Sequence, residues 1–244
     1  MSTSAFETLK HLTPTISVGM LTADLMNLGA DLALLEQAGV GLIHFDVMDG
    51  MFCPMATMGP PIIKGVKTPL LKDAHLMIAD PLPKLADYVA AGADILTIHV
   101  ESEPTHIHRV FQSLGAMSNA NDPGRGIVRG VAINPGTPVG VIEPVLDVVE
   151  MIVLLAINPG WGGQKFSAST AERVAQVRRM IGDRDILVAV DGGITRDNSP
   201  EVAAMGADLI VTGSAVFDGK APLENAKAML AAIKPFGNLF PKSK

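Results

Sequence analysis

Short runs of apolar, often β-branched residues alternate with amphipathic stretches along almost the whole chain. The apolar runs have the length and composition of buried strands, and they predict strands at residues 15–21, 42–47, 72–77, 95–100, 128–133, 151–156, 186–190 and 209–212. The stretches between them have apolar residues at helical spacing, and they predict helices at residues 24–38, 60–66, 83–91, 105–114, 139–146, 169–181, 199–205 and 222–233. The pattern therefore indicates repeated strand–helix units.

Eight units of similar length in a chain of 244 residues favour a (β/α)8 TIM barrel. A doubly wound open sheet is the alternative fold for the same alternation of strands and helices. No linker or shift in composition divides the sequence, so we expect a single domain over residues 1–244. Within it, we expect residues 1–14 to form an N-terminal extension and residues 236–244 to form a C-terminal tail.

The second predicted strand carries the most informative polar residues. His44 and Asp46 alternate with Phe45 and Val47, so the polar pair is expected on one face of the strand and the apolar pair on the other. An imidazole and a carboxylate at this spacing can bind a divalent metal ion and can also transfer protons. A lone histidine at a strand end is more often a packed, hydrogen-bonded side chain than a metal ligand. The motif therefore indicates a metal site only because similar residues recur at the ends of other strands.

The same kinds of residue end two further predicted strands. His75 lies near the end of the third strand, and Asp191 follows the seventh. Because the carboxyl ends of barrel strands surround one mouth, we expect a shared site made by four residues: His44, Asp46, His75 and Asp191. Two imidazoles and two carboxylates suit one divalent ion, which could be Zn²⁺, Fe²⁺, Mn²⁺ or Co²⁺.

Three glycine-bearing loops follow the last three predicted strands. They contain Gly162-Gly163, Gly192-Gly193 and Gly213-Ser214. Glycines let backbone N–H groups approach an anion closely, and the loops after the seventh and eighth strands of such barrels often bind phosphate. Any one of these glycines could simply form a tight turn, but the succession favours a phosphate-binding site.

Composition narrows the classes of partner. The net charge is −6 and no run of Lys or Arg occurs, which argues against nucleic acid as a partner. No apolar run approaches the roughly 20 residues of a membrane-spanning helix, and no secretory signal is recognisable at the N-terminus. The single cysteine, Cys53, excludes an internal disulfide framework. We therefore expect a cytoplasmic protein that acts on a small molecule.

The sequence resembles the ribulose-phosphate 3-epimerase family from about Ile16 to Phe217, in the order of the family's motifs. The matching segments are His44-Phe45-Asp46-Val47-Met48-Asp49-Gly50, Gly59-Pro60-Pro61, His75-Leu76-Met77, His99-Val100-Glu101, Asn134-Pro135-Gly136-Thr137-Pro138, residues 158–166, Val190-Asp191-Gly192-Gly193-Ile194 and Gly213-Ser214-Ala215-Val216-Phe217. A series of this length is far more specific than any single motif.

The resemblance implies a TIM barrel of the ribulose-phosphate-binding type that inverts C3 of a ketose phosphate, most readily D-ribulose 5-phosphate to D-xylulose 5-phosphate, through an enediolate. It implies that Asp46 and Asp191 are the acid/base pair, and that the four residues named above bind the metal ion. It further implies that Met48 and Met77 line the substrate and that the three glycine loops bind its phosphate. His99 and Glu101 either orient a metal ligand or are satisfied polar groups at the mouth. A homo-oligomer is also implied.

The chain departs from the family at several positions beside the site. Gly19 stands where the family has a serine, Met51 and Met55 stand where it has polar residues, and Leu155 replaces a methionine. These changes leave the reaction type better supported than the substrate, and a hexulose 6-phosphate is an alternative. A lyase or decarboxylase on the same barrel would usually need a lysine near the metal ion or the substrate, for which Lys72 is the nearest candidate. A non-catalytic sugar-phosphate binder is the third possibility.

Overall fold

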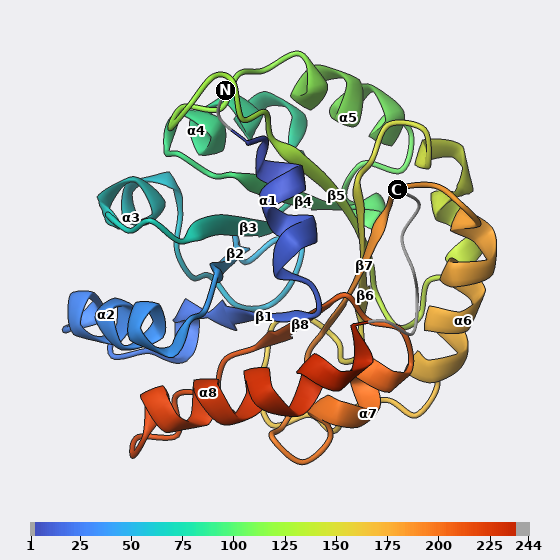
Figure 1. Cartoon of the computed structure of the whole chain (residues 1–244). Coiled ribbons are helices and arrows are strands. Elements are labelled where there is room, and N and C mark those ends of the chain that lie inside the picture. The colour runs from blue at the N-terminus through green and yellow to red at the C-terminus, as the bar shows by residue number, and fades with distance from the viewer. Residues whose placement is uncertain (1–2, 238–244) are drawn as a thin grey trace.

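The computed structural model describes residues 3–237 and shows a closed barrel of eight parallel strands. Each strand pairs with its neighbours in chain order, and the first strand closes the barrel against the last (Figure 1). The strands are β1 (Thr15–Gly19), β2 (Leu42–Met48), β3 (Leu71–Met77), β4 (Ile95–His99), β5 (Val128–Ile133), β6 (Met151–Leu155), β7 (Leu187–Asp191) and β8 (Leu209–Thr212). The predicted (β/α)8 barrel is confirmed, and the open sheet is excluded.

Helices surround the barrel in the order that the sequence predicts. They are α2 (Leu28–Ala38), α3 (Pro60–Gly65), α4 (Leu85–Ala90), α5 (Ile107–Gly115), α6 (Thr170–Ile181), α7 (Ser199–Ala204) and α8 (Pro222–Ile233). Short 3-10 segments add η1 (Met20–Thr22), η2 (Leu82–Lys84), η3 (Val100–Ser102) and η5 (Lys234–Phe236). The α-helix predicted at 139–146 is wrong: this segment is a 3-10 helix, η4 (Val139–Val145), in which Pro144 removes a backbone donor.

Strand register and alternation place the polar residues of β2 and β3 inside the barrel. His44 is paired with Asp73, and Asp46 with His75, in a parallel ladder. Phe45, the residue between the two polar positions of β2, is fully buried in the outer layer between strands and helices. The predicted division of β2 into a polar and an apolar face is therefore confirmed.

A helix that precedes the barrel covers its amino-terminal end. α1 (Ala5–Leu12) lies across this end, in front of the strands in Figure 1. Its Ala5 and Leu9 are fully buried against inward-facing residues at the start of the strands, among them Leu42 and Leu71. The expected N-terminal extension, as far as it is described, is thus an ordered helix. The expected C-terminal tail lies, from residue 238 onward, outside the described residues.

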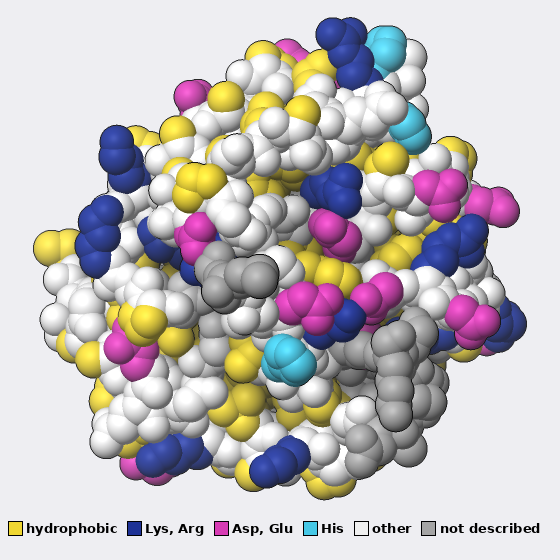
Figure 2. All heavy atoms as spheres, turned by 45° about the horizontal axis from the view of Figure 1, so that its top comes forward, with side chains coloured by type: hydrophobic (Ala, Val, Ile, Leu, Met, Phe, Trp, Pro, Cys, Tyr) yellow, Lys and Arg dark blue, Asp and Glu magenta, His cyan; other side chains and the backbone are white. Residues whose placement is uncertain are grey.

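Within residues 3–237, no helix is long and apolar enough to cross a membrane. On the face shown in Figure 2, acidic and basic side chains are interspersed rather than gathered into one large patch of a single sign. That face therefore has no extended field of one sign that would attract a polyanion.

Candidate active site

The four residues predicted to bind a metal ion meet at the carboxyl-terminal mouth of the barrel. One ligand atom from each of His44, Asp46, His75 and Asp191 lies within 4.8 Å of the others. His44 Nε2 is 3.5 Å from an Asp46 oxygen and 3.9 Å from Asp191 Oδ2. His75 Nδ1 is 3.3 Å from the same Asp191 oxygen. Strands β2, β3 and β7 thus bring residues from distant parts of the sequence into one cluster.

Two ring nitrogens that face this cluster lack a hydrogen-bond partner among the described residues. They are His44 Nε2 and His75 Nδ1, and both histidines are almost completely buried. An unsatisfied buried polar atom costs about 1–3 kcal/mol, so native structures contain few of them. A divalent cation between these nitrogens and the carboxylates of Asp46 and Asp191 would satisfy both, so the residues present fit a metal ion.

Asp73, which sequence reasoning did not assign to the site, orients His44. Its Oδ2 lies 2.7 Å from His44 Nδ1 and also accepts a hydrogen bond of 3.1 Å from the Ser17 hydroxyl. A carboxylate accepts the Nδ1 proton, so the Nε2 lone pair of a neutral His44 faces the cluster. The available signal was its spacing: Asp73 lies two residues before His75 and therefore also faces inward.

The electrostatics of the cluster favour a bound cation. Burial lowers the pKa of His44, but the carboxylates of Asp73 and Asp46 outweigh burial and raise this pKa well above its usual value. Burial likewise raises the pKa of Asp46, yet His44 outweighs it and lowers the pKa below its usual value. Negative charge at this depth therefore stabilises a cation, which can be a proton or a metal ion.

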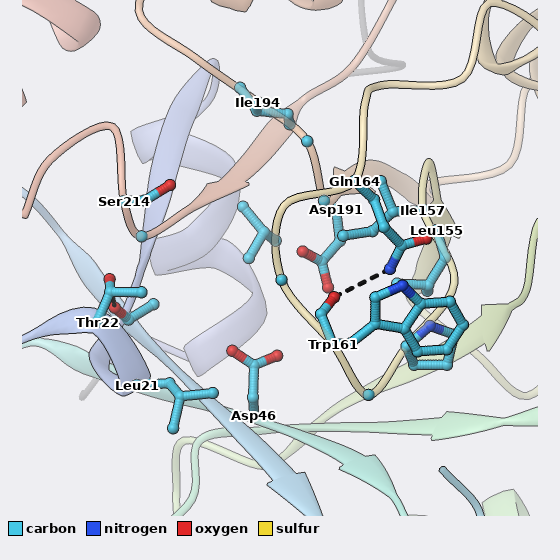
Figure 3. A pocket seen from close by; sticks show the side chains of 18 of the residues that line it. Leu21, Thr22, Asp46, Leu155, Ile157, Trp161, Gln164, Asp191, Ile194 and Ser214 are labelled. Atoms are coloured by element: carbon cyan, nitrogen blue, oxygen red, sulfur yellow. Dashed lines mark hydrogen bonds between the residues drawn. The ribbon is translucent and has the colours of Figure 1, made fainter. Parts of the chain in front are cut away.

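A pocket of about 340 Å³ opens beside the cluster. Figure 3 shows the carboxylates of Asp46 and Asp191 directed into it from different strands, with Thr22 and Ser214 on one side and Trp161 and Gln164 on the other. All residues that the resemblance places against the substrate or its phosphate line this pocket: Met48, Met77, Gly162, Gly163, Gly192, Gly193, Gly213 and Ser214. The sequence therefore identified residues that share one cavity.

The glycines of this pocket differ in what they do locally. Gly192 has φ +97°, and a Cβ there would lie 2.3 Å from Ile157, so the tight turn alone explains the glycine. Gly162 has no positive φ, and a Cβ there would meet no atom within 4 Å, so neither backbone conformation nor space requires a glycine at this position. Open space in front of Gly162 leaves room for a ligand to approach the backbone.

The loop that contains Gly162 is closed by a side chain that the sequence did not single out. Gln164 donates through its amide nitrogen to the carbonyls of Asn158 and Trp161, at 2.6 and 2.9 Å, and accepts from the Asn158 N–H at 3.0 Å. Trp161 extends from the same loop over the pocket with half of its surface exposed. These bonds give the loop a defined shape beside Asp46 and Asp191.

Lys72, His99 and Glu101, which the sequence left with open roles, lie outside the pocket. Lys72, the lysine that a lyase would have required, donates to the Ile63 carbonyl at the end of α3 at 2.7 Å and does not line the pocket. His99 and Glu101 lie behind His75. Burial lowers the pKa of His99 to about 4, so this ring is neutral at physiological pH.

Comparison with known proteins agrees with this geometry. The chain matches the ribulose-phosphate 3 epimerase family over residues 15–217. It is 44% identical to ribulose-phosphate 3-epimerase of Rhodobacter capsulatus, covering 84% of this chain and 86% of that protein. It is 41% identical to ribulose-phosphate 3-epimerase of Bacillus subtilis, covering 83% and 91% respectively. The chain is also 37% identical to the putative epimerase LsrE of Salmonella typhi, covering 91% and 89%.

Solved structures support the fold alone. The barrel is similar to 3-hexulose-6-phosphate synthase of Salmonella typhimurium, with a TM-score of 0.65 and 15% identity, covering 91% of this chain and 99% of that protein.

The family match covers most of the barrel, including all three strands that carry the His/Asp cluster, and relatives above 40% identity carry the same name. The chain therefore belongs to the ribulose-phosphate 3-epimerase family, whose members are isomerases acting on carbohydrate phosphates.

Proposed function

We propose that the chain is a metal-dependent epimerase that inverts C3 of D-ribulose 5-phosphate to form D-xylulose 5-phosphate. The observation that carries the proposal is the pair of carboxylates, Asp46 and Asp191, directed into one pocket beside two buried histidines. The relatives named above support the reaction, and the pocket supports a substrate of sugar-phosphate size.

Inversion at C3 requires removal of a proton from one face of the carbon and delivery of a proton to the opposite face. Asp46 and Asp191 come from strands on different sides of the pocket, β2 and β7, and each would serve as base in one direction and as acid in the other. Proton removal next to the ketone leaves an enediolate. A divalent ion held by His44, Asp46, His75 and Asp191 would stabilise the negative charge on the enediolate oxygens.

The apolar wall of the pocket supports this acid/base role. Met48, Met77 and Leu155 line the pocket beside the carboxylates, and Met77 and Leu155 are almost fully buried. Thioether and aliphatic groups exclude water without competing for hydrogen bonds, and desolvation makes a carboxylate a better proton acceptor. Leu155 thus preserves the apolar character of a family methionine.

We further propose that the substrate phosphate binds the backbone of Gly162-Gly163, Gly192-Gly193 and Gly213-Ser214. Within the described residues, no Lys or Arg lines the pocket, so the donors available to an anion are backbone N–H groups and neutral side chains such as the Ser214 hydroxyl. The Gly162→Ala variant tests this proposal, because the added methyl group meets no protein atom. It should raise KM for the sugar phosphate severalfold, whereas Gly140→Ala, in equally open space outside the pocket, should leave KM unchanged.

Deuterium uptake at C3 in D2O, followed by NMR, tests the reaction. The wild-type protein with a divalent metal ion should exchange and invert C3 of D-ribulose 5-phosphate. Asp46→Asn and Asp191→Asn should each lower kcat at least 100-fold, because each removes one member of the acid/base pair. Asp197→Asn, the same change at an exposed residue near the mouth, should retain wild-type activity. Exchange at wild-type rate in both site variants would contradict the mechanism.

A hexulose 6-phosphate is the second candidate substrate. A specific observation favours testing it: Met55 lines the pocket, and Gly19 leaves space beside Asp46 where the family has a serine. The same D2O experiment with a hexulose 6-phosphate separates the two. Reaction with the hexulose alone would reassign the substrate while keeping the C3 chemistry.

We also propose a homo-oligomer. The support is a set of large apolar side chains that a monomer leaves in water, including Met26 at 95% and Met51 at 80% exposure. Light scattering coupled to size-exclusion chromatography should give a mass at least twice 25.6 kDa, and a monomeric mass at micromolar concentration would contradict the proposal.

A further inference from the structure

A chain of buried polar side chains leads away from the candidate metal ligand His75. The Nε2 atoms of His75 and His99 are 2.9 Å apart, and the two ring planes are inclined by only 9°. His99 Nδ1 is 3.0 Å from Glu101 Oε2. Both histidines are fully buried, so these contacts are the partners available to their outer nitrogens.

The carboxylate of Glu101, at the end of this series of side chains, acts only as a hydrogen-bond acceptor. Glu101 Oε1 accepts a hydrogen bond of 2.7 Å from the Asn134 N–H and another from the Thr137 hydroxyl. These donors, together with His99, outweigh burial and lower the pKa of Glu101 to about 2. Its second oxygen, Oε2, therefore faces His99 as an ionised acceptor, which requires a proton on His99 Nδ1.

The position of the proton on His99 then determines the position of the proton on His75. A neutral His99 that carries its proton on Nδ1 presents a lone pair at Nε2. His75 must then donate from its own Nε2, since two lone pairs 2.9 Å apart would repel. The remaining nitrogen of a neutral His75, Nδ1, is left without a proton, and it is this atom that faces Asp191 and the cluster.

We propose that Glu101 and His99 are positioning residues that hold His75 in the Nε2–H tautomer and so present its Nδ1 lone pair to the metal ion. The proposal deepens the proposed function and rests on it. It also gives a role to two family motifs that the reaction itself does not use, His99-Val100-Glu101 and the segment of residues 134–138.

The segment that holds Glu101 is itself anchored. Arg173 of α6 donates to the Asn134 carbonyl at 2.9 Å and to the Pro135 carbonyl. Arg173 is 9% exposed, so these bonds are shielded from water. Glu101 is thus held by a loop that α6 fixes in place, which makes the acceptor a stable feature of the fold.

The two candidate histidine ligands would use opposite nitrogens. Asp73 contacts Nδ1 of His44, whose Nε2 faces the cluster, whereas the chain through His99 contacts Nε2 of His75, whose Nδ1 faces the cluster. Each ligand has an acceptor behind it that fixes its tautomer, as is common at metal sites. For His75 the acceptor acts through a second imidazole.

Glu101→Gln is the decisive variant, because it keeps the size of the side chain and replaces one acceptor oxygen with a donor. If the amide nitrogen faces His99, the proton of His99 moves to Nε2, and His75 must carry its proton on Nδ1. ¹⁵N NMR of the metal-free protein should show His75 as the Nε2–H tautomer in the wild type and an increased Nδ1–H population in the variant. Competition with a chelator should show a 10- to 100-fold loss of Co²⁺ affinity.

Matched variants separate positioning from general damage. Glu103→Gln, the same change at a half-buried residue two positions away whose carboxylate contacts His106 instead of His99, should keep the wild-type tautomer and Co²⁺ affinity. His99→Gln can still offer an acceptor to His75 and should retain more Co²⁺ affinity than His99→Leu, which offers none. Circular dichroism confirms that each variant is folded.

Two results would overturn the proposal: an Nδ1–H tautomer of His75 in the metal-free wild type, or unchanged Co²⁺ affinity in folded Glu101→Gln. A wild-type protein that shows the expected tautomer but binds no divalent ion would contradict the proposed metal-dependent function instead. The NMR measurement therefore distinguishes the two failures.

Discussion

At the scale of single residues, the site is made by side chains whose partners determine what they can do. His44 and His75 are both buried histidines within strands, which is ordinary in a core. What distinguishes them is that each has one hydrogen-bonded ring nitrogen and one ring nitrogen with no hydrogen-bond partner within residues 3–237, and these second nitrogens face the carboxylates of Asp46 and Asp191. Spacing in the sequence predicted the four residues but could not predict which ring nitrogen faces inward.

Gly19 offers a test of the main departure from the family. Its backbone has φ −67° and ψ 115°, and an added Cβ would lie 3.5 Å from Gly213 and 3.8 Å from an Asp46 oxygen, which are ordinary contacts. Gly19→Ser should therefore fold normally. A hydroxyl here that bonds the substrate contributes about 0.5–1.5 kcal/mol, so KM for D-ribulose 5-phosphate should fall roughly two- to tenfold.

Gly19→Ala is the matched control, because it fills the same space without a hydroxyl group. The alanine variant should not lower KM for the pentulose phosphate. An equal change of KM in both variants would show that occupied volume, rather than the hydroxyl, determines the effect.

The lowered pKa of Glu101 predicts that the stability of the protein depends on pH. Its pKa is about 2 in the folded protein against an ordinary value of 4.5, so the folded state favours the ionised form. A lowered pKa contributes stability that is present above pH 4.5 and is lost as the pH falls toward 2. With the side chain 23% exposed, we expect this contribution to be about 2 kcal/mol.

Denaturant unfolding between pH 5 and pH 2.5 checks this expectation. The free energy of unfolding should fall more steeply for the wild type than for Glu101→Gln, which has no proton to gain at this position. Parallel curves for the two proteins would contradict the assigned hydrogen bonds of Glu101.

At the scale of elements, the order of strands and helices was predictable, and the ends of the elements were less so. The sequence predicted strands at 128–133 and 209–212 with the bounds that the structure shows. The helix predicted at 24–38 begins only at Leu28, and the segment after β5 is a 3-10 helix. Periodicity reports which face is buried, whereas the ends of a helix depend on local capping and on proline.

The helix α1 provides a prediction at this scale. Leu9 is fully buried against the inner residues at the amino-terminal end of the barrel. Leu9→Ala should lower the free energy of unfolding by about 2–5 kcal/mol, because it leaves a cavity under the strands. Since the active site is at the opposite end, kcat and KM of the folded variant should not change.

Thermal and denaturant unfolding check the prediction, with His11→Ala on the exposed face of the same helix as the control. The control should unfold like the wild type. A Leu9→Ala protein of wild-type stability would mean that α1 does not contribute to the barrel core.

At the scale of the whole molecule, barrel closure joins residues that the sequence keeps far apart. β2 and β3 are neighbours, but Asp191 reaches the cluster from β7, on the other side of β1 and β8. A metal ion bound by all four residues would therefore link opposite sides of the barrel mouth.

Metal removal should lower the stability of the whole barrel for this reason. An ion present at 100 times its Kd stabilises the folded state by about 2.7 kcal/mol, which corresponds to a Tm increase of roughly 5–10 °C for a domain of this size. Differential scanning calorimetry with Co²⁺ or with chelator measures the difference. Asp191→Asn should respond much less, and an identical Tm with and without metal in the wild type would contradict a bound ion.

The sequence by itself determined the repeated strand–helix unit, the inward face of β2, the glycine loops and the family, because these are local patterns in residue order. Only the tertiary structure decided that α1 covers one end of the barrel, that Lys72 faces outward to α3, and that Asp73 and the chain from Glu101 to His99 contact the two histidines from behind. These features depend on strand register and barrel closure, which bring together atoms whose separation along the chain carries no signal of their contact.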